Sequence, residues 1–478
     1  MPTPIRVRGR RKTPSRSKDG VPKPVPSGPK GGRPMLPPDA KRRIESYKRT
    51  RPLPAQPPPP RPRKRVLSRL ESLPVELIEK IFLYSLSVSL PRSSPSIRAA
   101  VSSERVYRAL MLLAFFDPER IALPELYQPS SGTVSSADPK TVALKVSEAQ
   151  ISRILRPLEY VHLGKGERRS LQASVVSCRW CTIERLMSSL PDLMLLNIWR
   201  YWVPETHGMS NDQQDQLDLF LARRSNALDL EIVDGDYRRS ISVTPLVSVT
   251  IRHAGPDIDS TVTINTLDVF KIPDKFLSGG DAGFSEAHAR FLELFRVAGG
   301  INRLSSTERI NEINFSREAI QQGIHMALVE HNANVLTTLL KIDEFTFRCQ
   351  NHLADTLYML PSEYFCTAVV MARHDPKFFQ LLLRASAESI PFDDSKITQW
   401  AITEGGPFQQ WLLDFMLQLP EQVKATTRGN QQMFYNGGLN AANAMAERYL
   451  RNVLGTDEPK VWLEESPYTF SDDWVVEN

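Results

Sequence analysis

The chain has 478 residues, 41% of them hydrophobic, which is enough for two or three domains with sizeable cores. Its four cysteines fit reduced thiols and not a disulfide framework, and no apolar run reaches the roughly 18 residues of a membrane span. The N-terminus has charge and proline where a secretory signal needs an apolar run, so we expect an intracellular protein.

The net charge of +6 is divided unevenly along the chain. Residues 1–65 hold 20 Lys/Arg, 3 Asp/Glu and 17 of the 37 prolines, which predicts a disordered basic tail. The basic clusters of this tail fit either a nuclear import signal or a solubilising tail. No base-reading fold and no stacking aromatic residues accompany these clusters, which argues against sequence-specific binding of nucleic acid. The candidate import residues are Arg10, Arg11, Lys12, Arg63, Lys64 and Arg65.

The first folded element is predicted where the tail ends. Apolar residues recur there at helical spacing, at Leu73, Leu77, Ile81 and Phe82. Pro74 suits a first helical turn, and Leu90-Pro91 is expected to end the pattern. A second helix is predicted within residues 102–116, with Ser102 or Ser103 as its N-cap. Residues 66–116 therefore read as a small helical module.

The segment from Leu70 to Phe82 has the pattern Leu-x-x-Leu-Pro-x-Glu-Leu-x-x-x-Ile-Phe, and it resembles the F-box family. The element Leu90-Pro91-Arg92-x-Ser94 that follows is similar to a fungal variant of that module. The resemblance implies docking on a Skp-type adaptor of a cullin-RING ubiquitin ligase. The implied partner-binding residues are Leu70, Leu73, Pro74, Leu77, Ile81, Phe82, Leu90 and Pro91. The alternative is a proline-capped amphipathic helix packed into its own domain.

The body begins with a predicted loop at 117–140 and a helical domain at 140–300. Short helices are expected to open at Ser147, Thr182 and Pro191, with another over 213–228. Two stretches rich in Val, Ile and Thr, Ser240–Arg252 and Ser260–Ile272, predict a β-hairpin near 240–272. Pro245 is expected to place the first strand at an edge or to split it. The predicted fold class is therefore mainly α with a β-hairpin insertion.

A helical period returns at Ser285 and is expected to stop at Gly299-Gly300. Residues 301–460 then show helix pairs that faintly resemble ankyrin repeats, around Ala327, Ala368 and Ala401. The resemblance implies paired helices stacked on their neighbours, and generic α-hairpin packing is the alternative. The acidic, aromatic segment 461–478 is interpreted as a C-terminal tail, either frayed or docking.

No residue pattern indicates intrinsic catalysis, so we expect neither an enzyme nor a cofactor or metal site. Cys178 and Cys181 supply only two of four zinc ligands and are interpreted as small buried residues sharing one helix face. The eight histidines are scattered, without a His-Glu-x-x-His motif.

The sequence thus supports an F-box-type adaptor whose helical body binds a protein substrate, in the nucleus, the cytoplasm or both. The alternatives are a nuclear interaction scaffold without a ligase link and, more weakly, a protein tethered to nucleic acid by its basic tail.

Overall fold

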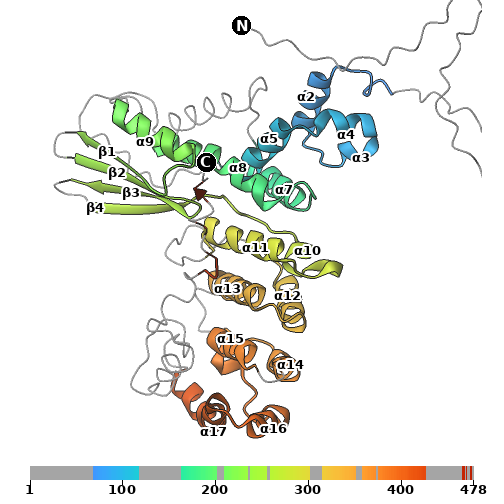
Figure 1. Cartoon of the computed structure of the whole chain (residues 1–478), viewed down its shortest axis with the longest axis vertical. Coiled ribbons are helices and arrows are strands. Elements are labelled where there is room, and N and C mark those ends of the chain that lie inside the picture. The colour runs from blue at the N-terminus through green and yellow to red at the C-terminus, as the bar shows by residue number, and fades with distance from the viewer. Residues whose placement is uncertain are drawn as a thin grey trace, which may run out of the picture. The chain divides into compact units, whose positions relative to one another are not determined.

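The computed structural model describes residues 68–117, 163–201, 209–234, 237–255, 259–301, 315–350, 358–372, 375–426, 466–468, 470 and 474–475. The chain divides into two units, Met1–Val66 and Leu67–Asn478, and all of the described residues belong to the second. That unit is mainly helical and contains one small antiparallel sheet (Figure 1), which confirms the predicted fold class. The predicted basic tail and its import candidates lie outside the described residues.

Four helices form the N-terminal module: α2 (Val75–Ser85), α3 (Leu90–Ser93), α4 (Pro95–Val101) and α5 (Glu104–Phe115). The predicted cap at Ser103 is confirmed, since its hydroxyl accepts a hydrogen bond from the Val106 N–H at 3.4 Å. The predicted stop at Leu90-Pro91 is wrong. Helix α2 ends earlier, because Leu86 adopts a left-handed conformation with φ of 47°. Pro91 instead lies in the first turn of α3, where a missing N–H is tolerated.

Three helices follow, namely α7 (Lys165–Val176), α8 (Ile183–Tyr201) and α9 (Asn211–Leu221). The predicted helix start at Pro191 is wrong, because Pro191 lies inside the continuous helix α8. A proline there removes one backbone hydrogen bond. The neighbouring side chains of Leu190, Leu193 and Met194 are fully buried, and their packing offsets that loss. The helix predicted to open at Ser147 lies outside the described residues.

The sheet has four antiparallel strands in the order β1 (Leu228–Asp234), β2 (Tyr237–Thr244), β3 (Ser248–Ala254) and β4 (Asp259–Asn265). Pro245 splits the predicted first strand into β2 and β3, which pair with Ile241 opposite Ile251. The predicted antiparallel strand pairing is therefore present, but the sheet has four strands where the prediction had two. Strand β1 was missed: its first residue, Leu228, was assigned to the end of a helix predicted over 213–228, and residues 229–234 were assigned to no element.

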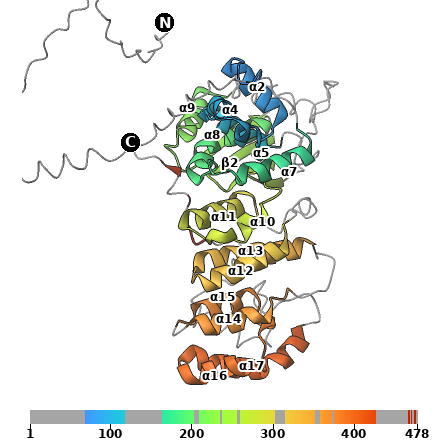
Figure 2. The same cartoon turned by 90° about the vertical axis from the view of Figure 1, so that its right-hand side faces the viewer.

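Helices in consecutive pairs make up the remainder of the fold (Figure 2). Contacts join α12 to α13, α14 to α15 and α16 to α17, and further contacts join α12 to α14, α13 to α15 and α14 to α16. The architecture of stacked helix pairs is thus present, and its relation to ankyrin repeats stays a prediction. The elements are α10 (Asp274–Leu277), α11 (Glu286–Ala298), α12 (Arg317–Val329), α13 (Ala333–Gln350), α14 (Ser362–Ala372), α15 (Lys377–Ala385), α16 (Ser395–Glu404) and α17 (Pro407–Thr426).

The described part of the C-terminal segment packs against this body. Trp474 is fully buried, and its indole Nε1 donates a hydrogen bond to the Ser225 carbonyl at 3.0 Å. Its ring lies 5.2 Å from the Phe220 ring, and Arg223 Nε donates to the Trp474 carbonyl at 2.7 Å. Of the two interpretations of 461–478, the described residues therefore favour a docking segment, and the site on which they dock belongs to the chain itself.

Candidate docking surface

Helix α2 carries an exposed apolar surface beside a fully packed one. Pro74, Leu77, Ile81 and Tyr84, named here the α2 patch, are all exposed, with Leu77 at 47% and Ile81 at 40%. Leu77, Ile81 and Tyr84 follow one another at i, i+4 and i+7, so they form one stripe along the helix. Ile78 and Phe82 lie on another side of the helix and are only 3% and 2% exposed. The helix thus has separate inner and outer apolar sides.

Polar contacts fix the orientation of α2. The buried carboxylate of Glu79 pairs with Arg105 of α5 and accepts a hydrogen bond from the Ser103 hydroxyl at 3.1 Å. The Ser94 hydroxyl, which caps α4, donates to Glu71 just before α2. An unpaired charge at the site of Glu79 would be costly, so this ion pair opposes rotation of the helix about its axis. The α2 patch is consequently held outward by the module itself.

The eight predicted partner-binding residues fall into three groups in the structure. Pro74, Leu77 and Ile81 are exposed. Leu70, Leu73, Leu90 and Pro91 are half-buried, and the three leucines pack against the core. Phe82 is a core residue, so the structure removes it from the exposed surface that a partner could reach. Tyr84 was missed by the sequence reasoning, although its spacing of seven from Leu77 was a usable signal.

The two cysteines of the Cys-x-x-Cys motif lie in the turn between α7 and α8, and not on one helix face as predicted. Cys181 is buried, and this burial raises the pKa of its thiol to about 12. Cys178 is half-buried, and its pKa is also raised by burial. Both thiols are therefore protonated near neutral pH, which disfavours nucleophilic chemistry.

A partly buried titratable cluster links helices α12 and α13. Asp343 of α13 is paired with Arg317 of α12 at 3.1 Å and accepts a hydrogen bond from the Tyr358 hydroxyl at 2.7 Å. Burial raises the pKa of Asp343, and the Arg317 charge opposes this rise. Both carboxylate oxygens of Asp343 accept hydrogen bonds from other residues of the chain, so the cluster ties α12 and α13 to the segment that holds Tyr358.

The described part of the chain contains neither a metal-binding cluster nor a membrane-spanning helix. No group of three or more His, Cys, Asp or Glu side chains there could hold a metal ion. None of the helices there combines the length and apolar character that a bilayer crossing requires. The α2 patch is therefore the candidate site that the sequence and the geometry indicate together.

Comparisons with models of protein families, with curated proteins and with solved structures each found no match to this chain.

Proposed function

We propose that this protein is an F-box-type adaptor, a substrate receptor of a Skp-cullin-F-box ubiquitin ligase. The α2 patch would bind the Skp-type adaptor, and the helical body would bind a protein substrate. The observation that carries the proposal is the exposure of Leu77 and Ile81, two apolar residues of the F-box-like segment Leu70–Phe82. They lie on a helix whose other apolar residues, Ile78 and Phe82, already fill the core. Single exposed apolar side chains are common on protein surfaces, whereas a contiguous stripe of them is typical of an interaction site.

The α2 patch suits a helix-in-groove or helix-on-helix contact. Leu77, Ile81 and Tyr84 present apolar area in a single stripe, as the anchors of such interfaces do. Lys80 lies beside them, with its Nζ 5.7 Å from the Tyr84 ring centroid, and gives the patch a polar rim. The patch is small, so the half-buried residues Leu90 and Pro91 on α3 would have to widen the interface.

The chain would then act by proximity. One polypeptide that holds a substrate and a ligase turns their encounter into an intramolecular event with a high effective concentration. The ubiquitin transfer would be carried out by the ligase, and the chain itself would supply only the two binding surfaces.

The test is a pull-down of the full chain with a purified Skp-type adaptor. We expect the double variant Leu77→Asp, Ile81→Asp to lose binding, because both charges would be buried without a partner at the interface. The matched control is Ile402→Asp, Leu417→Asp, which alters two apolar residues that are 64% and 81% exposed on α16 and α17. Equal thermal unfolding of the variants would show that they fold. The proposal would be wrong if the unchanged chain failed to bind the adaptor. It would also be wrong if the folded Leu77→Asp, Ile81→Asp variant still bound it.

A nuclear interaction scaffold without a ligase link is the second candidate. The stack of helix pairs favours it, because three of its apolar side chains, Val370, Ile402 and Leu417, are more than 60% exposed and could contact a protein partner. The pull-down separates the two functions: a scaffold would not bind the Skp-type adaptor.

A further inference from the structure

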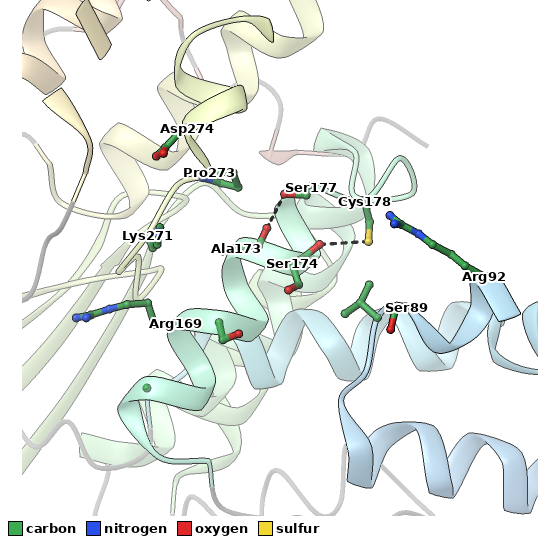
Figure 3. Close-up of a pocket in the computed structure, with 13 residues that line it drawn as sticks. Ser89, Arg92, Arg169, Ala173, Ser174, Ser177, Cys178, Lys271, Pro273 and Asp274 are labelled. Carbon is green, nitrogen blue, oxygen red and sulfur yellow. Dashed lines mark hydrogen bonds between the residues drawn. The ribbon is translucent and has the colours of Figure 1, made fainter. Parts of the chain in front are cut away.

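A basic groove runs along one side of helix α7 (Figure 3). Its volume is about 690 Å³. One wall is the segment between α2 and α3 with the end of α3, and the opposite wall is the segment that leads into α10. The lining residues are Val88, Ser89, Arg92, Gly166, Arg169, Ser170, Ala173, Ser174, Ser177, Cys178, Lys271, Pro273 and Asp274.

The floor of the groove is a single face of α7 and the turn after it. Its members recur at positions 166, 169, 170, 173, 174, 177 and 178, the spacing of one helix stripe. Apart from Arg169 they have small side chains, so a second chain can approach the helix backbone closely. None of the described residues lies within 4 Å of the position that a Cβ on Gly166 would take, so they leave this end of the groove open.

Positive charge is placed at both ends of this floor. Figure 3 shows Arg92 extending toward Cys178 at one end, with Arg169 and Lys271 at the other. In the described part of the chain neither Arg92 nor Lys271 has a carboxylate within ion-pair distance. Asp274 is the one acidic residue of the lining, against the three basic residues Arg92, Arg169 and Lys271.

We infer that this groove binds an acidic segment of a partner protein in an extended conformation. Arg169 lies seven positions before the end of α7 at Val176, about 10 Å along the helix, and Cys178 lies in the turn beyond that end. A single small anion cannot contact cations at both ends of such a groove. An extended peptide covers that length in about four residues, so acidic side chains at its two ends would meet both sets of cations.

The groove and the α2 patch are separate surfaces, so this inference does not depend on the proposed ligase function. Arg92 is next to Pro91, and a substitution at Arg92 could also alter adaptor binding. Lys271 is remote from α2 in sequence and belongs to the opposite wall, so it provides the cleaner variant.

The experiment measures binding of a fluorescein-labelled peptide, with two glutamate pairs separated by about four Gly/Ser residues, to the full chain at physiological salt. We expect Lys271→Glu and Arg92→Glu each to weaken binding by about tenfold or more, because attraction becomes repulsion. The matched control is Arg98→Glu, an exposed arginine on α4 outside the groove, which should leave the affinity unchanged. A peptide with glutamine in place of glutamate should bind far more weakly than the acidic one.

A second readout separates the groove from the basic segment 1–65, which also attracts acidic peptides. Cys178 lines the groove and Cys366 on α14 does not. We expect bound peptide to slow maleimide labelling of Cys178 and not that of Cys366, as resolved by mass spectrometry. The variant Leu77→Asp, Ile81→Asp should bind the peptide as the parent does, even if it loses the adaptor.

Three results would overturn the inference. The first is equal affinity for the glutamate and glutamine peptides, and the second is equal binding by the groove variants and by Arg98→Glu. The third is full displacement of the peptide by inorganic phosphate at the peptide's own concentration, which would indicate a site for small anions only. Failure of the parent chain to bind the adaptor, with its peptide binding intact, would count against the ligase proposal alone.

Discussion

Substituting Leu77 and Ile81 with alanine should separate partner binding from folding. Fully burying such a side chain contributes about 1.5–3 kcal/mol. Because 47% of Leu77 and 40% of Ile81 is still exposed, a partner that covers both would gain that fraction of the full value. The sum is about 1.3–2.6 kcal/mol, so the Leu77→Ala, Ile81→Ala variant should bind a Skp-type adaptor about 10- to 80-fold more weakly.

The free energy of unfolding should fall by less for each residue in the same variant than for a core residue. By the same arithmetic, the parts of Leu77 and Ile81 that the folded chain already covers contribute at most about 1.7–3.4 kcal/mol together, and this is an upper bound because the unfolded chain also buries part of them. Phe82→Ala is the opposite case, because this ring is 2% exposed and its loss leaves a cavity that costs about 3–5 kcal/mol. The assays are isothermal titration of the adaptor into each folded variant and urea unfolding of each variant alone.

Two outcomes would refute this reasoning. If the alanine pair lowers the unfolding free energy as much as Phe82→Ala, then Leu77 and Ile81 are packing residues and the α2 patch is not an outer surface. If the pair leaves both stability and adaptor affinity unchanged, the patch is exposed without being used by that partner.

Three further predictions concern the body. Trp474→Ala should lower the unfolding free energy by about 3 kcal/mol or more in urea, since the buried indole and its bond to the Ser225 carbonyl are lost; an unchanged midpoint would mean the segment is not docked. Gly323→Ala should lower the urea midpoint although alanine favours helices, because its Cβ would lie 2.1 Å from the Leu277 carbonyl oxygen; a higher midpoint would contradict that close approach. Burial raises the pKa of Cys181 from 9.0 to about 12, so its contribution to stability is complete below pH 9 and is lost between pH 9 and about 12; Cys181→Ala should remove that part of the pH dependence, and an identical slope would argue against the burial.

The sequence was most informative where local chemistry determines the backbone. The serine cap at Ser103, the start of a helix at Ser285 and the split of a strand at Pro245 could all be predicted, because each depends on residues within one turn. It was misleading at Pro191, where long-range burial outweighs a local helix breaker. The contact between Trp474 and Phe220 could not be predicted from the sequence, since no local pattern encodes a contact between residues about 250 positions apart.

The F-box-like string illustrates why the pattern alone could not decide between docking and packing. Apolar residues at 77, 78, 81 and 82 include two pairs at i, i+4, and neighbouring positions differ by about 100° around a helix. One pair, Ile78 and Phe82, must then face the core if the other, Leu77 and Ile81, faces away from it. A helix packed only into its own domain needs Ile78 and Phe82 for its core. The exposed parts of Leu77 and Ile81 add nothing to its stability. The packing interpretation therefore explains why Phe82 is buried and does not explain why Leu77 and Ile81 are apolar. A docking partner would explain the apolar character of Leu77 and Ile81 as well.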